Sequence, residues 1–531
     1  MADRIHITTA IHYSNGPPHL GHAYEAIVAD TFARHYRRKL GKGNVTFVTG
    51  TDEHGQKNRD AAVKAGKSPR EFVDGTSTLF KEAFATLEIS YDKFVRTTDD
   101  THKKFVQRML TLTKERGDIY FKDYEGLYCV GCERFYTEKE LLPGNVCPVH
   151  KQPVETVREG NYFLKLEKHR AAILKRIAEQ PDFIRPERYK NEALQMLTEP
   201  LEDLCISRPK SRLDWGIELP FDDKYVTYVW YDAFCAYLSE LEDTSIEALS
   251  QVLPTTHHFI GKDILKTHAV YWPSILLAAG LPLYGHLNVH GFLNFGGERL
   301  SKSAGNIVDP MALANKYGPD VLRYFVLREF VYGLDGDFTE DRIVERYNAD
   351  LANGLGNLTS RVLTMATKYF GGEITAEFPP PSLQDTDFYE YPGSLGSIVD
   401  SPPSYQAKAA AFLECLHFKG TLDLIWERVG AADHYIVVTA PFTLAKDQTK
   451  LPEVAKILAN LVEGLRLIAV ELEPYMPKTS WRILELLNLD EATARAPYRE
   501  AIKSGHRVKP AIPLFPRIEK KAPSPVHPTA R

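Results

Sequence analysis

The sequence predicts an α/β protein in which a parallel sheet is split by an insert and followed by a helical region. Strand-like apolar runs alternate with helical patterns near the N-terminus and again after residue 225, with a cysteine-containing stretch of short β-like runs between them. Beyond residue 342 the apolar residues recur at helical spacing. We therefore expect five segments: a first half-domain at 1–118, an insert at 119–224, a second half-domain at 225–341, a helical domain at 342–515 and a tail at 516–531.

Length and composition indicate a soluble protein of several domains. The chain has 531 residues, of which 44% are hydrophobic and 25% charged, so it is too long for a single core but ordinary in composition. No secretory signal opens it, and the longest apolar run, 269–283, is broken by prolines, so we expect a cytoplasmic protein without a membrane span. The net charge of -5 argues against a globally basic nucleic-acid binder, although a local patch could hold a phosphate backbone.

The first unit has the order strand, Gly-containing loop, helix, strand. Apolar residues alternate from Ile5 to Ile11, and the Asn15-Gly16-Pro17-Pro18 turn ends that strand. Apolar residues then recur at helical spacing from Ala26 to Leu40, and Gly41 is placed to end the helix. The run 45–49 supplies the second strand. This βαβ unit predicts a Rossmann-like sheet, with a ligand crevice at the carboxyl ends of its strands.

The insert carries a metal-binding pattern. Two knuckles, C-x-x-C and C-x-x-H, supply three thiolates and one imidazole at Cys129, Cys132, Cys147 and His150. This set is complete for tetrahedral zinc and leaves no open position, so we expect one structural Zn²⁺ per chain. A reduced remnant of a knuckle and a redox pair are the alternatives. The remaining cysteines are isolated, and each is interpreted as a small buried hydrophobe.

The second half-domain and the helical domain follow the insert. Strand-like runs recur at 225–230, 258–260 and 287–293. Residues 454–472 carry an apolar stripe at helical spacing, which indicates core packing. Residues 372–406, rich in Pro, Ser, Gly and Asp, are interpreted as a surface excursion between helices.

Two short motifs have the residues for phosphate chemistry. Pro18-His19-Leu20-Gly21-His22 stands where strand gives way to helix, so unpaired N–H groups, the helix dipole and two imidazoles could meet a phosphate. Gly21 would let a ligand approach the backbone. Arg299-Leu300-Ser301-Lys302-Ser303 suits a loop that folds over a triphosphate. Taken alone, the first motif could be a surface turn and the second a solvated loop.

Together the two motifs resemble the paired HIGH and KMSKS signatures of class I aminoacyl-tRNA synthetases. Further segments resemble the methionyl-tRNA synthetase family: residues 8–16 (TTAIHYSNG), 49–56 (TGTDEHGQ), 229–233 (VWYDA) and 259–264 (FIGKDI). The resemblance extends from about residue 5 to residue 517. It implies a Rossmann-like catalytic domain split by a zinc-knuckle insert and followed by a helical anticodon-binding bundle.

The resemblance also implies the reaction and its residues. Methionine would attack the α-phosphorus of ATP to give methionyl-adenylate and pyrophosphate, and the methionyl group would pass to the terminal ribose of tRNA(Met). Mg²⁺ would accompany ATP. The implied catalytic residues are His19, His22 and Lys302. The implied ATP-binding residues are Asn15, Gly16, His19, Gly21, His22, Arg299, Ser301, Lys302 and Ser303.

A methionine pocket is implied by the same resemblance. Its residues are Ile11, Tyr13, Asp52, Trp230, Ala233, Tyr237, Ile264 and His268, with Asp52 near the amino group. A flexible thioether suits aromatic and aliphatic walls, and a carboxylate suits an ammonium. Without the family, Trp230, Ala233 and Tyr237 would be taken for core because they are at helical spacing. Four neighbours depart from the family pattern: Ala10, His12, Phe234 and Thr267.

The anticodon residues implied by the resemblance are Asn357, Arg361 and Phe442. Asn357 and Arg361 lie one helical turn apart and could read a base edge together. Phe442 stands where the family has a tryptophan that stacks on an anticodon base. Without the family, the first two are ordinary helix-surface polar residues and Phe442 is a core phenylalanine.

Three other functions compete with this interpretation. A sister class I synthetase is disfavoured because the insert at 119–224 is short for the editing domains of the valine, isoleucine and leucine enzymes. A non-charging tRNA-binding paralogue predicts a missing catalytic group, yet His19, His22 and Lys302 are present. A free-standing metal-dependent RNA-binding protein leaves the nucleotide fold unexplained. Because the sequence shows no further dimerising domain after residue 515, we expect a monomer.

Overall fold

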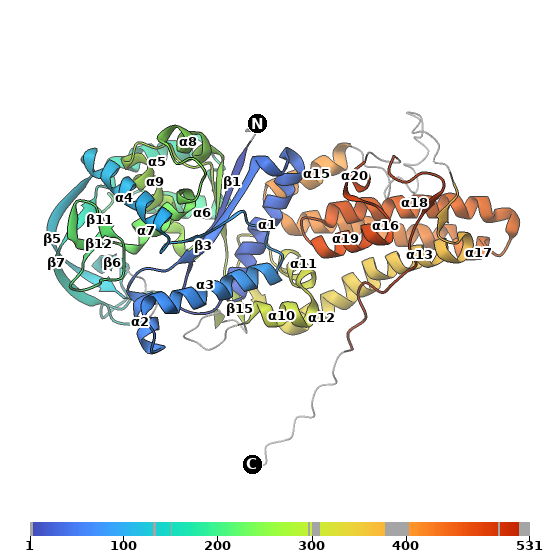
Figure 1. Ribbon diagram of the computed structural model, residues 1–531, viewed down its shortest axis with the longest axis horizontal. Coiled ribbons are helices and arrows are strands. Elements are labelled where there is room, and N and C mark those ends of the chain that lie inside the picture. The colour runs from blue at the N-terminus through green and yellow to red at the C-terminus, as the bar shows by residue number, and fades with distance from the viewer. Residues whose placement is uncertain are drawn as a thin grey trace, which may run out of the picture. The chain divides into compact units, whose positions relative to one another are not determined.

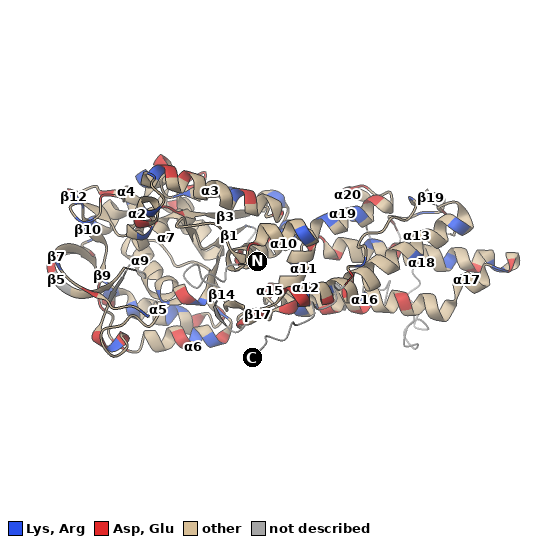
Figure 2. Ribbon diagram, turned by 90° about the horizontal axis from the view of Figure 1, so that it is seen from below, with Lys and Arg blue, Asp and Glu red and all other residues tan. Residues whose placement is uncertain are grey.

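The computed structural model describes residues 4–130, 134–149, 151–295, 298–299, 308–376, 403–496 and 500–519. The chain forms two compact units. Unit 1 comprises Met1–Leu293, Arg299–Met311 and Gly333–Asp335, and unit 2 comprises Asn294–Glu298, Ala312–Tyr332 and Gly336–Arg531. Basic and acidic residues are interspersed along the helices of both units (Figure 2).

Unit 1 is built on one parallel sheet. Its strands run in the order β2-β3-β1-β13-β14-β8, and β4 pairs with β3 outside that path. The bounds are β1 (Ile5–Thr9), β2 (His12–Tyr13), β3 (Val45–Asp52), β4 (Lys93–Arg96), β8 (Ile184–Arg185), β13 (Thr256–Gly261) and β14 (His286–His290). The strand order reverses beside β1, which pairs with β3 on one side and β13 on the other, so a ligand crevice belongs at this edge. The predicted α/β class with a parallel sheet is confirmed.

Helices cover both faces of this sheet (Figure 1). Phe259 of β13 packs on Phe32 of α1 (Leu20–Leu40), with ring centroids 5.2 Å apart. The preceding residue, His258, faces Tyr237 of α7 (Val229–Ser239) at 4.7 Å instead. Since neighbouring strand residues point to opposite faces, α1 and α7 lie on opposite sides of β13. The other helices of the first half-domain are α2 (Gln56–Lys64), α3 (Pro69–Thr86) and α4 (Asp100–Glu115).

The predicted helix after the first turn is confirmed. Helix α1 buries the alanines of its apolar face, and Gly41 ends it with φ of 90°, a conformation that favours glycine. The run 225–230 is only partly a strand, since β12 (Asp222–Thr227) ends before α7 begins at Val229. Trp230 is therefore helical. The extended residue Tyr228 separates the two elements, a boundary that a continuous apolar run does not reveal.

The insert contains two antiparallel sheets. One has the order β6-β5-β7-β9 and the other β10-β12-β11. The bounds are β5 (Ile119–Cys129), β6 (Arg134–Tyr136), β7 (Glu155–Leu164), β9 (Leu204–Cys205), β10 (Ser207–Pro209) and β11 (Glu218–Leu219). Two helices were not predicted here, α5 (Glu167–Glu179) and α6 (Glu187–Met196). Strand β8 lies between them in sequence and joins the main sheet beside β14, so the insert extends the main parallel sheet.

The second half-domain continues with α8 (Ile246–Val252), a π-helical turn at Thr267–Tyr271 and α9 (Trp272–Ala278). After Leu293 come the short strands β15 (Leu293–Phe295), β16 (Glu298–Arg299) and β17 (Gly336–Phe338). Between β16 and β17 lie α10 (Pro310–Tyr317) and α11 (Pro319–Glu329), so helical structure begins before the predicted boundary at residue 342.

Unit 2 is mainly helical, as expected. Its further elements are α12 (Glu340–Arg346), α13 (Asn357–Phe370), α15 (Pro403–Glu414), α16 (Phe418–Thr439), α17 (Pro441–Leu444), α18 (Leu451–Leu472), α19 (Pro477–Leu486) and α20 (Glu491–Ala494). The apolar stripe of α18 is buried, which confirms the predicted core helix. Strands β18 (Glu373–Ile374) and β19 (His506–Arg507) pair at one side. In the described part of the chain, no helix is both long and apolar enough to cross a membrane.

Candidate active site

A pocket of about 1740 Å³ opens at the carboxyl edge of the parallel sheet. Residues at or just after four strand ends line it: Ala10 after β1, Asp52 of β3, Gly261 of β13 and His290 of β14. The remaining walls come from the start of α1, from α7, from the stretch after β13 and from the insert. The pocket therefore occupies the crevice that the strand order predicts.

The N-terminus of α1 presents two stacked imidazoles to this pocket. The rings of His19 and His22 lie 3.6 Å apart, and Nδ1 of each accepts a backbone N–H: His19 from Gly21 at 3.1 Å, and His22 from His19 at 3.2 Å. A neutral imidazole whose Nδ1 accepts carries its proton on Nε2, so both rings are set to donate. A Cβ at residue 21 would lie 3.0 Å from the His19 ring, which is why glycine fits there. Helix dipole and imidazole donors together suit an oxyanion.

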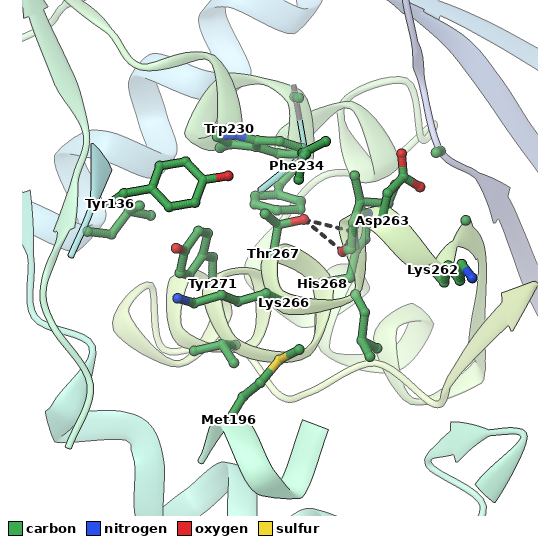
Figure 3. Close-up of a pocket in the computed structure, with 18 of the residues that line it drawn as sticks. Tyr136, Met196, Trp230, Phe234, Lys262, Asp263, Lys266, Thr267, His268 and Tyr271 are labelled. Carbon is green, nitrogen blue, oxygen red and sulfur yellow. Dashed lines mark hydrogen bonds between the residues drawn. The ribbon is translucent and has the colours of Figure 1, made fainter. Parts of the chain in front are cut away.

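An aromatic wall of the pocket is formed by the start of α7 together with Tyr13. Trp230 lies edge-to-face with Tyr13 at 6.5 Å and beside Phe234 at 5.9 Å. Figure 3 shows Trp230, Phe234 and His268 together in the pocket. The buried Nε1 of Trp230 has no hydrogen-bond acceptor among the described residues. The wall is therefore apolar, with one N–H donor left for a ligand.

One polar group in this wall has a defined protonation state. Nδ1 of His268 donates to the Ile264 carbonyl at 2.9 Å, so its Nε2 accepts from the Tyr237 hydroxyl at 2.7 Å. Burial lowers the pKa of His268 to about 4, which keeps the ring neutral near pH 7. A neutral imidazole and a phenol in an aromatic wall offer weak polar contacts to a soft thioether.

Asp52 closes another side of the pocket. It is buried at the end of β3, and its backbone carbonyl accepts from Asn58 Nδ2 at 2.9 Å. Lys57 also lines the pocket, with Nζ 5.0 Å from the centre of the Tyr13 ring. A carboxylate in this position suits a ligand ammonium group.

Polar residues that the sequence analysis did not assign also line the pocket, among them Glu25, Asp263 and His290. Nε2 of His290 lies 3.0 Å from Glu25 Oε2. Burial alone would lower the pKa of His290, but the hydrogen bond and charge of Glu25 outweigh it and raise that pKa. Glu25 follows His22 by one helical turn on α1, a spacing that could have revealed it.

The structure brings most of the predicted ATP- and methionine-binding residues to this one pocket. All eight predicted methionine-binding residues line it: Ile11, Tyr13, Asp52, Trp230, Ala233, Tyr237, Ile264 and His268. Asn15, His19, Gly21 and His22 line it as well, whereas Gly16 does not. This convergence is a property of the fold, since these residues come from both half-domains.

The predicted phosphate loop falls largely outside the described residues. Ser301, Lys302 and Ser303 lie there, and Arg299 is described only as part of strand β16. The described chain resumes at Val308, whose carbonyl accepts from the backbone N–H of Leu20 at 3.0 Å. The segment after the loop is thus attached to the first turn of α1, beside His19 and His22.

The predicted zinc ligands are described only in part. Cys129 and Cys147 belong to one buried cluster with Tyr136, and Cys147 Sγ lies 3.6 Å from the Tyr136 hydroxyl. Cys132 and His150 lie outside the described residues. Within the described ranges, no group of three or more His, Cys, Asp or Glu side chains could hold a metal ion. The zinc site stays a prediction. The thiols of Cys129 and Cys147 are compatible with it, because both belong to the same buried cluster.

The predicted anticodon residues lie in unit 2. Asn357 is exposed at the start of α13, and Arg361 is half-buried, with Nη1 2.9 Å from Asp433 Oδ1 of α16. Phe442 lies on α17 with 48% of its surface exposed, which argues against the core alternative. Val437 and Val438, on the last turn of α16, are exposed too.

Comparisons with known proteins agree with this arrangement. The family model "tRNA synthetases class I (M)" matches residues 5–153 and 140–363. The methionine--tRNA ligase of Caldanaerobacter subterraneus is 42% identical over 523 residues, which cover 98% of this chain and 80% of that protein. The methionine--tRNA ligase of Clostridium tetani is 41% identical, with 97% and 79% covered.

A solved structure of Mycobacterium tuberculosis methionyl-tRNA synthetase in complex with methionyl-adenylate is similar throughout. Its sequence is 36% identical, the TM-score is 0.89, and the match covers 97% of this chain and 100% of that one. Sequence and structure thus agree over nearly the whole length. The chain belongs to the methionyl-tRNA synthetase family of the class I tRNA synthetases.

Proposed function

We propose that the chain is an ATP-dependent methionine--tRNA ligase whose pocket activates methionine and then transfers it to tRNA(Met). One observation carries the proposal: the aromatic wall, the Asp52 carboxylate and the two-histidine helix N-terminus line a single pocket. Amino acid and α-phosphate would meet there without a covalent enzyme intermediate. The related ligases and the adenylate-bound relative support the same reaction.

Methionine would lie with its side chain against Trp230 and its ammonium group near Asp52. The Tyr237–His268 pair would contact the sulfur, since both groups are neutral and polar while the surrounding wall is aromatic. A longer or charged side chain would leave one of these contacts unmade. Selectivity would therefore come from shape and from a single weak polar contact.

The α-phosphate would lie at the N-terminus of α1. There the Nε2 protons of His19 and His22 and the positive end of the helix dipole would stabilise the negative charge that builds up as the methionine carboxylate attacks phosphorus. Arg299, Ser301, Lys302 and Ser303 are assigned to the β- and γ-phosphates on the sequence motif. Val308, five residues after Ser303 in the sequence, supports this assignment, because its carbonyl accepts from the backbone N–H of Leu20, next to His19. Mg²⁺ bound with ATP would neutralise charge on the leaving pyrophosphate.

The helical unit would bind the anticodon of tRNA(Met). Phe442 offers a half-exposed ring for base stacking, and Asn357 with Arg361 offers donors on one helix face. Arg361 is held by Asp433, so its guanidinium is already oriented. A cytoplasmic, monomeric, zinc-containing enzyme remains our prediction from the sequence.

Amino-acid-dependent exchange of pyrophosphate into ATP, run separately with all twenty amino acids, tests the activation step. The proposal expects exchange with methionine far above that with the others. A second reaction with tRNA(Met) tests the transfer. Exchange with another amino acid would indicate a sister synthetase, and binding of tRNA without any exchange would indicate a non-charging relative.

A further inference from the structure

A buried carboxylate joins two walls of the pocket without lining it. Asp232 of α7 is fully buried, with Oδ2 2.7 Å from Nδ1 of His54 and Oδ1 2.6 Å from Nε2 of His102. The other ring nitrogen of His102, Nδ1, lies 3.0 Å from the Ser239 hydroxyl. Asp232, His54 and His102 are absent from the pocket lining. We call these three residues the Asp232 node.

Charge keeps the node together. Burial would raise the pKa of Asp232, but the charges and hydrogen bonds of His54 and His102 outweigh burial and hold that pKa below its ordinary value. The carboxylate therefore remains ionised and accepts from both rings. A buried charge of this kind tolerates little displacement, because each lost donor leaves it unsatisfied.

One arm of the node ends at Asp52. His54 follows Asp52 by two residues, and Asn58 Nδ2 ties the two together by donating to both backbone carbonyls, at 2.9 Å for Asp52 and 2.8 Å for His54. Trp215 packs on the His54 ring at 5.4 Å and donates from Nε1 to the Glu53 carbonyl at 2.6 Å. These contacts hold the backbone of residues 52–54 in place, and with it the end of β3 that carries the Asp52 carboxylate.

The other arm is α7 itself. Asp232 lies between Trp230 and Ala233, two residues of α7 that line the pocket, so the contacts of its carboxylate hold this part of α7 in place. His102 anchors the same carboxylate to α4. The distance between the Asp52 carboxylate and the Trp230 indole is therefore set by the short path Asp52–His54–Asp232–Trp230.

We propose that Asp232 is a positioning residue for methionine binding. This inference rests on the function proposed above. The Asp232 node holds the ammonium site at Asp52 and the side-chain site at Trp230 at the distance that one bound methionine requires. Asp232 touches neither substrate nor phosphate. Its loss impairs ligands that use both sites together, and spares ligands that use the side-chain site alone.

Two inhibitors separate this role from a general loosening of the pocket. L-Methioninol carries the ammonium group, the thioether and a terminal hydroxyl, whereas 4-(methylthio)butan-1-ol keeps the thioether and the hydroxyl and lacks only the amino group. In wild type the first binds more tightly by the contribution of Asp52. The ratio of the inhibition constant of 4-(methylthio)butan-1-ol to that of L-methioninol is therefore well above one in wild type, and it falls towards one in Asp232→Asn and His54→Ala. In the same two variants the methionine KM rises by about 10- to 100-fold, while the ATP KM stays close to wild type.

Matched variants complete the test. His54→Asn keeps an N–H donor at the same number of bonds from the backbone and restores most of the ratio. Asp118→Asn is the control, because Asp118 is also a buried carboxylate, paired with Lys168 at 2.5 Å and near His169 at 3.5 Å, but it does not line the pocket or contact α7 through these partners. If Asp232→Asn fails to fold, His54→Ala decides the result.

The inference is overturned if the inhibitor ratio is unchanged in His54→Ala, if both inhibitors weaken equally, or if Asp118→Asn has the same effect. A wild-type protein without methionine-dependent exchange would instead overturn the proposed function. Direct titration of the two inhibitors onto wild type and His54→Ala still tests the spacing in that case, since it needs no turnover.

Discussion

The Tyr237 hydroxyl donates to Nε2 of His268 over 2.7 Å, and both groups are buried in the wall of the pocket. The direction of this bond follows from the other ring nitrogen, which donates to the Ile264 carbonyl. The pair is therefore oriented before any ligand arrives. Such preorganisation lowers the cost of binding a side chain that has only one polar atom.

Tyr237→Phe removes this donor and leaves the ring in place. We expect the methionine KM to rise by roughly 5- to 20-fold, the size of one lost neutral hydrogen bond, with little change in the ATP KM. Steady-state pyrophosphate exchange measures both. Tyr231→Phe is the control, since Tyr231 lies on the same helix with its hydroxyl 2.9 Å from Thr113 Oγ1, away from the pocket lining. Equal effects of the two variants would contradict a role for Tyr237 in the site.

Lys302→Ala tests the phosphate loop. We expect the variant to fold normally and to form adenylate about 10²- to 10³-fold more slowly, as for the loss of one charge contact made in the transition state. Single-turnover adenylate formation and thermal melting measure the two properties. Lys64→Ala, a change at an exposed lysine, is the control and should behave as wild type in both measurements. Near-normal adenylate formation in Lys302→Ala would rule out the loop assignment.

Elemental analysis tests the zinc site. We expect about one zinc per chain, and we expect Cys147→Ser to lose the metal and loosen the insert, because a hydroxyl replaces one of the thiolates that complete a closed structural site, and metal binding there stabilises the fold. Cys205→Ser is the matched control, as Cys205 is also buried but lies outside the Cys129–Cys147 cluster. Wild-type protein purified without chelators and found free of zinc would show that the knuckle is a remnant.

Phe442 gives a test in the helical unit. Aromatic stacking on a base is worth about 1–3 kcal/mol, so we expect Phe442→Ala to weaken discrimination between the CAU anticodon and its single-base variants. Phe442→Trp should sharpen it, and adenylate formation should stay unchanged in both. Trp481→Ala, a change at another partly exposed aromatic of this unit, is the control. Undiminished discrimination in a folded Phe442→Ala would exclude the stacking role.

Local patterns predicted much of the fold. The helix from Leu20 to Leu40 and its end at Gly41 followed from apolar spacing and one glycine, both of which act within a few residues. Strand β8 could not be predicted in the same way, because its two residues become a strand only by pairing with β14, about a hundred residues further along the chain.

The candidate site, like the fold, could be predicted only in part from the sequence. Motif and resemblance led to residues that share the pocket, including His19, Trp230 and His268. The sequence could not reveal which of these distant residues pair: His54 and Asp232 are 178 residues apart, and Glu25 and His290 are 265 apart. Such pairings depend on which strand ends the fold brings together, so they appear only in three dimensions.

Trp230→Ala tests the central claim most directly, namely that this pocket holds methionine with its side chain against α7 and its carboxylate towards the helix of His19 and His22. Trp230 would touch only the side chain, so its truncation should affect one substrate. We predict that pyrophosphate exchange will show a methionine KM raised far more than the ATP KM in a variant that melts cooperatively. If both KM values rise equally, or neither changes, Trp230 is a core residue and methionine binds elsewhere.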